Sequence, residues 1–183
     1  MRRKAATDLF GGARTGVAIG LVVAAMALLA GAPALAAAHT VHVTIVADQT
    51  PADNGYNLDG YARGGMTVTV PVGWKVVVTF KNDGALAHSL IVLPYTSTPP
   101  AAPASETPAF PGAATKHLAK GLPRGTTTTF SFVASRPGTY EFVCGVPGHA
   151  TLGMWDKLVV SATAKKPSIT PAPAAKIVHL VAQ

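Results

Sequence analysis

The stretch Phe142 to Trp155, FVCGVPGHATLGMW, brings three potential metal donors into one short segment. Cys144, the only cysteine of the chain, is followed by His149 after five residues and by Met154 after five more. Two glycine-containing turns lie between these residues and would fold the segment so that the three side chains converge. A thiolate, an imidazole and a thioether are the donors that redox-active copper prefers. The stretch therefore predicts a copper-binding loop that follows an apolar strand.

A copper centre of this kind needs a second histidine, and the best candidate is His88 in the run LAHSLIVLP. Alternation places His88 on the apolar face of an expected strand over 87–93. It places Cys144 on the apolar face of an expected strand over 139–144. Two inner faces that meet at one end of a sandwich would bring both residues together. A register shift of one residue would separate them.

Each of these residues also has an ordinary structural interpretation when it is taken alone. A single cysteine is most often a small buried hydrophobe, and a methionine beside a tryptophan is most often part of a core. A packed core has no need of three donors in one loop that turns back on itself, so the joint pattern favours a metal site. His117, in a proline-rich segment, is expected to be exposed, with metal contact as the alternative for it.

The first 38 residues have the layout of a secretory signal peptide: a basic start, an uncharged run over 15–38 and small residues at its end. Cleavage is expected after Ala36 or Ala38. The alternative is a retained membrane anchor, because the uncharged run is long enough to span a bilayer. Either outcome places the domain outside the cytoplasm, in a periplasmic or extracellular location. A lone cysteine in an exported chain indicates a reactive thiol or a metal ligand.

The charge of the chain does not indicate a nucleic-acid partner. The formal net charge of the 183 residues is +7, but four of the 15 basic residues and one of the 8 acidic residues lie in 1–38, which leaves +4 for the rest. The only basic cluster outside that segment is Lys165-Lys166. We therefore expect no nucleic-acid-binding surface.

Beyond residue 38 most segments alternate apolar and polar residues with period two, as half-buried strands do. Val41, Val43 and Ile45, for example, share one face of the first run. Proline and glycine punctuate these runs, and no stretch shows a convincing helical period. The pattern predicts an all-β fold, a β-sandwich built from many short strands.

The alternation lapses between Pro94 and Arg124, where five prolines between positions 99 and 111 predict a long irregular loop packed over the sandwich. The sandwich domain is placed at 39–163, and residues 164–183 are expected to form a Lys/Pro/Ala-rich tail. The apolar end of that tail is far too short to span a membrane.

The chain resembles the cupredoxins, the family of blue copper proteins, and within it the sulfocyanins, with rusticyanin as a relative. The resemblance covers roughly 41–162, and it is most specific in the ligand loop CGVPGH and Gly153-Met154-Trp155-Asp156. Weaker matching segments are Tyr56 to Tyr61, Gly65-Met66, Val70 to Trp74, His88 to Leu90 and Gly138 to Tyr140. The proline-rich loop and the tail depart from the family pattern.

The resemblance implies a cupredoxin-like Greek-key β-sandwich that holds one type 1 copper ion. It implies that the copper ligands are His88, Cys144, His149 and Met154. Ser89 matches a position that shapes hydrogen bonding near the thiolate in related proteins, and such donors tune the reduction potential. The alternative for Ser89 is an ordinary serine that faces solvent. Asn82 is expected to be a turn residue with Asp83 and Gly84.

The expected function is one-electron transport outside the cytoplasm by a monomer that is not an enzyme. Redox proteins would act as the electron donor and acceptor, through a weak apolar contact near His149. The main alternative is a copper delivery or storage protein of the same fold, although Met-rich tracts are missing from the sequence. A cysteine hydrolase using Cys144 and His149 would need an exposed, activated thiolate. A two-copper centre would need a second cysteine.

Overall fold

The computed structural model describes residues 39–171 and 181–182. The expected signal peptide or membrane anchor, residues 1–38, lies outside the described residues. Among the described residues, no helix is long and apolar enough to cross a membrane.

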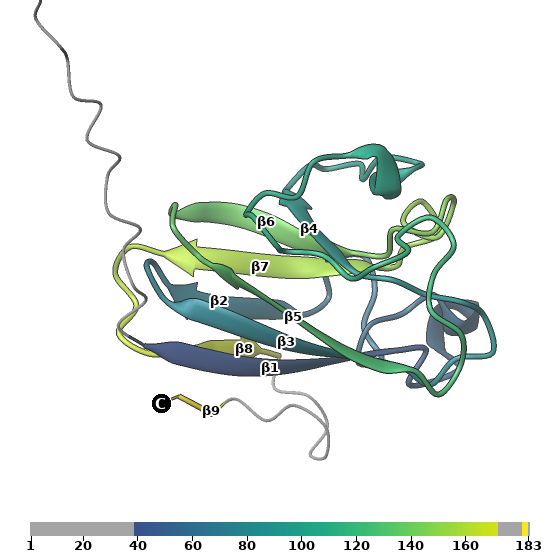
Figure 1. Ribbon diagram of the computed structural model, residues 1–183, viewed down its shortest axis with the longest axis horizontal. Helices are drawn as coiled ribbons and strands as arrows, with labels where there is room; N and C mark the ends of the chain where they lie inside the picture. Colours follow the sequence, from purple (N-terminus) through teal and green to yellow (C-terminus); the bar gives the residue numbers. More distant parts are fainter. Residues whose placement is uncertain (1–38, 172–180, 183) are drawn as a thin grey trace, which may run out of the picture. The chain divides into compact units, whose positions relative to one another are not determined.

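Two mixed β-sheets make up the described part of the chain (Figure 1). One sheet has the order β5-β3-β1-β9 and the other has the order β4-β6-β7-β2-β8. The strands of the first sheet are β1 (Thr40–Ala47), β3 (Lys75–Asn82), β5 (Thr127–Val133) and β9 (Val181–Ala182). Those of the second are β2 (Thr67–Pro71), β4 (Ile91–Pro94), β6 (Gly138–Val143), β7 (Trp155–Ser161) and β8 (Ser168–Thr170). Two short 3-10 helices, η1 (Ala52–Gly55) and η2 (Pro103–Ser105), lie in the connections.

The core lies between apolar faces that the sequence pattern predicted. β1 and β3 run parallel and in register, so their inward residues form pairs: Val41 with Val76, Val43 with Val78 and Ile45 with Phe80. β5 adds two buried phenylalanines, and the facing sheet adds the apolar faces of β2, β6 and β7. Burying one such side chain contributes about 1.5–3 kcal/mol, so the strand faces stabilise the sandwich without a metal. The predicted all-β sandwich is confirmed.

The proline-rich loop between β4 and β5 packs onto the sandwich, as predicted. Phe110 is fully buried and stacks on Phe132 of β5, with ring centroids 5.2 Å apart. Its ring also lies 4.6 Å from that of Tyr140 in β6. The backbone of Val92 in β4 pairs with the loop on both of its polar groups, accepting from Ala109 and donating to Ala113. The loop therefore covers β4 instead of leaving it as a bare sheet edge.

Two boundaries differ from those expected. The strand expected over 87–93 is β4 and begins only at Ile91, because the preceding residues bond to the loop rather than to a strand: His88 pairs with Leu122. The expected tail contains β8, which pairs antiparallel with β2 and adds an edge strand to the second sheet. A three-residue edge strand leaves little periodic signal in a Lys/Pro-rich sequence, so the alternation did not reveal it.

Candidate metal centre

Three of the predicted ligands come together at one end of the sandwich. The Sγ atom of Cys144 lies 3.5 Å from Nδ1 of His149 and 3.9 Å from Nδ1 of His88. The two Nδ1 atoms are 3.2 Å apart. His88 and Cys144 are fully buried, and His149 is half-buried. Within the described residues, this is the group of histidine, cysteine and acidic side chains whose arrangement could hold a metal ion.

Strand register explains how residues so far apart in sequence meet. Ile91 of β4 pairs with Val143 of β6, so the segment before β4 and the residue after β6 lie at the same end of the sheet. Cys144 is the residue directly after β6. A hydrogen bond also holds the two segments together: the backbone N–H of Gly145 donates to Oγ of Ser89 over 3.1 Å. His88 and Cys144 therefore meet at one end of the sandwich, as predicted, but they meet because β4 and β6 are neighbours in one sheet and not because the inner faces of the two sheets come together.

Backbone hydrogen bonds close the loop between Cys144 and Met154. The N–H of Cys144 donates to the carbonyl of Met154 over 3.0 Å, and the N–H of Met154 donates to the carbonyl of His149 over 3.1 Å. Met154 is fully buried in the same core cluster as Cys144. Gly148 and Gly153, with φ of 85° and 109°, supply the turns that this path requires. The loop thus folds back as the sequence indicated.

Burial favours the uncharged forms of all three converging groups in the metal-free protein. It lowers the pKa of His88 to about 4, with a smaller contribution from the nearby His149. Burial also lowers the pKa of His149 and raises the pKa of the Cys144 thiol. Hydrogen bonds from Ser89 and from the backbone of Val146 offset part of the shift at the thiol. A buried thiol with a raised pKa is the opposite of an activated nucleophile, which argues against the hydrolase alternative.

The donor set fits a copper ion. Neutral imidazoles offer lone pairs, and a thiol binds a metal by losing its proton. Metal–nitrogen bonds of about 2.0–2.1 Å and metal–sulfur bonds of about 2.3 Å, the lengths known for zinc, set donor atoms about 3–4 Å apart around one ion. The three separations fall in that range. One thiolate with two imidazoles is the trigonal set of blue copper sites.

Ser89 and Asn82 form hydrogen bonds with the segments that carry the ligands. Ser89 is fully buried, so the alternative of a solvent-facing serine is wrong. Its hydroxyl donates to the carbonyl of Leu118 over 2.7 Å while accepting from Gly145. Asn82 accepts from the N–H of Gly84 as the expected turn residue would. Its amide also donates to two backbone carbonyls, and the one of Leu122 is shared with the N–H of His88.

The other predicted and unpredicted residues can be placed relative to the site. His117 is exposed, as expected, and is not part of the converging group. Tyr56 packs edge-on against His149, with ring centroids 5.0 Å apart. Sequence reasoning assigned Tyr56 no role, because its contact joins segments more than ninety positions apart. The hydrogen bond from Asn82 to the carbonyl of Leu122 was not predicted either, because a local turn already explains an asparagine at this position.

The chain is similar to known copper proteins over most of its length. A family model for the sulfocyanin (SoxE) domain matches residues 31–170. Sulfocyanin of Sulfolobus acidocaldarius is 32% identical over 127 residues, which is 67% of this chain and 64% of that protein. The match thus spans a little under two thirds of the relative's length.

Solved structures of rusticyanin share the fold. A structure described as that of the copper protein rusticyanin has 30% sequence identity and a TM-score of 0.50, covering 67% of this chain and 78% of its own. Rusticyanin from Thiobacillus ferrooxidans has 29% identity and a TM-score of 0.51, covering 67% of this chain and 77% of its own.

Proposed function

The chain belongs to the sulfocyanin family of blue copper cupredoxins, and we propose that it is a mononuclear type 1 copper protein that carries single electrons outside the cytoplasm. The observation that carries the proposal is the approach of one thiol and two imidazole nitrogens to within 3.9 Å of one another in a buried site. A single bound copper ion would supply the redox chemistry by cycling between Cu(II) and Cu(I).

Each ligand has a distinct role in this proposal. Cys144 would hold the copper as the thiolate, having given up its proton. His88 and His149 bind through Nδ1, the nitrogens that face the thiol. Met154 would add a weak thioether donor, from a backbone position fixed by its hydrogen bonds to Cys144 and His149.

The surroundings of the site suit electron transfer with little structural change. His88 and Cys144 sit at the ends of hydrogen-bonded segments, and the loop that carries His149 and Met154 is closed by backbone hydrogen bonds. Close-packed side chains resist displacement, so the ligands keep one geometry in both oxidation states. A fixed geometry lowers the reorganisation that each transfer requires.

The half-buried His149 is the proposed exit for the electron. Its neighbours Val146, Pro147 and Gly148 are small or apolar, and Leu86 and Leu152 are both 46% exposed. Exposed apolar side chains suit short-lived contact with redox proteins, whose interfaces are small. The proposal includes a monomer, an unidentified donor and acceptor, and export directed by the segment at 1–38.

Copper delivery and electron transfer require different access to the copper ligands. Delivery requires donors that a recipient protein can reach, whereas Cys144 and His88 are fully buried. The test is to cycle the copper-loaded protein between oxidation states with ascorbate and an inorganic oxidant in the presence of a Cu(I) chelator. An electron carrier recovers its full visible band on each cycle and keeps one copper per chain. Loss of copper to the chelator during the first reduction would favour delivery and contradict the proposal.

A further inference from the structure

Hydrogen bonds join a segment outside the ligand loop to residues on both sides of Met154. The backbone N–H of Arg63 donates to the carbonyl of Gly153 over 2.8 Å, and the N–H of Gly64 donates to the carbonyl of Trp155 over 2.9 Å. The guanidinium of Arg63 adds a third bond of 2.8 Å, from Nη2 to the carbonyl of Leu152. Three residues that flank Met154, namely Leu152, Gly153 and Trp155, are therefore hydrogen-bonded to two residues of another segment, Arg63 and Gly64.

Side chains pack closely where residues 63–64 meet residues 152–155. A Cβ at Gly153 would lie 2.7 Å from Cζ of Arg63, and a Cβ at Gly64 would lie 2.6 Å from the Trp155 ring. Real Cβ atoms essentially never approach so closely, so a side chain at either glycine would require the Arg63 side chain or the Trp155 ring to shift. Arg63 has φ of 53°, a left-handed conformation that a non-glycine residue keeps only where its surroundings hold it.

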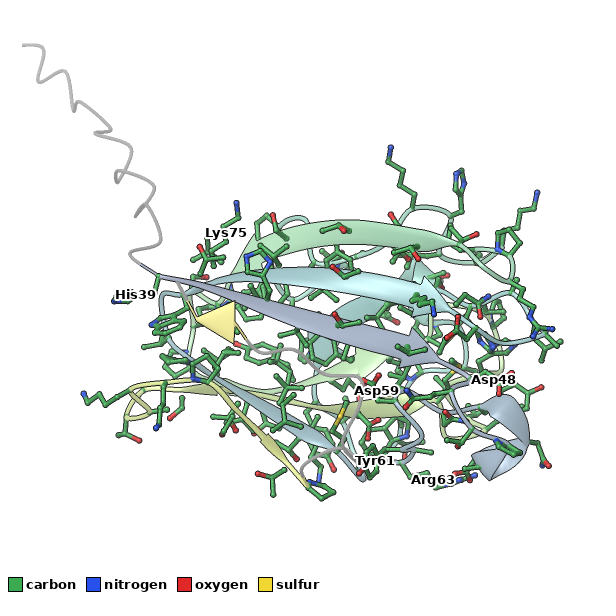
Figure 2. All side chains as sticks on the ribbon, turned by 90° about the horizontal axis from the view of Figure 1, so that it is seen from below. His39, Asp48, Asp59, Tyr61, Arg63 and Lys75 are labelled. Atoms are coloured by element: carbon green, nitrogen blue, oxygen red, sulfur yellow. The ribbon has the colours of Figure 1, made fainter. Side chains whose placement is uncertain are left out.

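The guanidinium of Arg63 has a second partner besides the carbonyl of Leu152. It forms an ion pair with Asp53 in η1, and Figure 2 shows Arg63 beside this short helix. The planar fork of an arginine can bind a carboxylate and a carbonyl at once, which a lysine ammonium does not reproduce in the same geometry. Tyr56, the residue directly after η1, packs against His149 of the ligand loop.

We propose that Arg63 is a positioning residue for the axial ligand: by pinning residues 152–155 it holds the Met154 thioether against the copper and thereby lowers the reduction potential. This inference rests on the proposed function. Compared with a site that has lost its fourth donor, a bound thioether stabilises Cu(II) more than Cu(I), because Cu(I) tolerates three ligands, so a well-held methionine lowers the potential relative to a loosely held one. When the hydrogen bond from the Arg63 side chain to residues 152–155 is lost, Met154 donates less effectively and the reduction potential rises.

The positive charge of Arg63 acts in the opposite direction, which makes the proposal testable. A nearby cation disfavours Cu(II) relative to Cu(I), so loss of the charge alone lowers the potential. Loss of positioning raises it. Arg63→Lys keeps the charge but loses the fork, and Arg63→Gln loses both.

The experiment is voltammetry and visible spectroscopy on copper-loaded full-length protein carrying Arg63→Lys or Arg63→Gln. Met154→Leu, measured beside them, gives the shift for complete loss of the axial donor. We expect Arg63→Lys to raise the potential by a substantial fraction of that shift and to change the thiolate-to-Cu(II) band in the same direction. A tenfold change in the ratio of Cu(II) to Cu(I) affinities corresponds to about 59 mV. Arg63→Gln is expected to rise less, because its charge effect opposes the positioning effect.

Arg136 provides the matched control. Its guanidinium also donates to a backbone carbonyl, that of Ala109 over 2.6 Å, but it precedes β6 at the end of the strand opposite Cys144. Arg136→Lys is expected to leave the potential unchanged. The inference is overturned if Arg63→Lys has the wild-type potential and band, or if both Arg63 variants lower the potential. If wild-type protein binds no copper and shows no band, the proposed function itself has failed.

Discussion

Glu141 is expected to make the protein more stable in mild acid than at neutral pH. Its side chain is fully buried on the face of β6 opposite the main core, and its partner across the ladder is Lys157, whose ammonium lies over the Tyr95 ring. Burial raises the pKa of Glu141 from 4.5 to about 7. The Thr96 backbone lies close enough to oppose this rise slightly, but neither carboxyl oxygen has a hydrogen bond of normal geometry within the described residues.

The sign and size follow from linkage. The folded protein holds a proton on Glu141 up to about pH 7, whereas the unfolded chain releases it near pH 4.5. The stabilisation is therefore complete below pH 4.5 and is lost as the pH rises to about 7. At 1.36 kcal/mol for each pH unit, the loss is about 3 kcal/mol.

The assay compares metal-free wild type with Glu141→Gln in urea at pH 4.5 and pH 8. Glutamine is nearly isosteric and cannot ionise, so we expect both proteins to have similar unfolding free energies at pH 4.5. At pH 8 the glutamine variant should be the more stable one, by up to about 3 kcal/mol. Other groups with shifted pKa values, including Asp59, Asp156 and His88, titrate in both proteins and cancel in the comparison. An equal difference between the two proteins at both pH values would refute the reasoning.

Three further outcomes follow from the site. Met154→Leu should keep the blue band and raise the reduction potential, while Met154→Gln should lower it, because an amide oxygen is a harder donor that favours Cu(II); identical potentials in the three proteins would remove Met154 from the ligand set. Ser89→Ala should lower the unfolding free energy by about 1–3 kcal/mol in urea titrations, because the buried N–H of Gly145 and the part-buried carbonyl of Leu118 lose their partner. A loss below the error of the titration would show that these groups find other partners. Copper should raise the melting temperature, yet the metal-free protein should keep β-type circular dichroism; collapse of that spectrum on copper removal would mean that the sandwich depends on the metal.

The main features of the fold and site could be predicted because they depend on local patterns. Period-two alternation depends only on which side of a strand each residue faces, so Val41, Val43 and Ile45 were placed in the core correctly. The spacing of Cys144 and His149 within one turn-rich loop is equally local. His88 was found because a blue copper site requires a second imidazole, and alternation put it on an inward face.

Features that depend on contacts between distant segments could not be predicted. Arg63 reads as an ordinary surface residue in a Gly-rich turn, and only the folded chain shows that it meets the carbonyl of Leu152, 89 positions away. Glu141 occupies a position that alternation assigns to solvent. It is buried because the proline-rich loop and a second apolar cluster, with Leu93 and Trp155, cover that face of the sheet.

The central claim is that Cys144, His88 and His149 bind one copper ion through the donor atoms that converge in the structure. The most direct measurement is the visible spectrum of the oxidised, copper-loaded protein together with its copper content, for wild type and Cys144→Ser. The account predicts one copper per chain and an intense band from charge transfer between the Cys144 thiolate and Cu(II), which Cys144→Ser abolishes. A wild-type protein that stays colourless with copper, or a Cys144→Ser variant that stays blue, would contradict it.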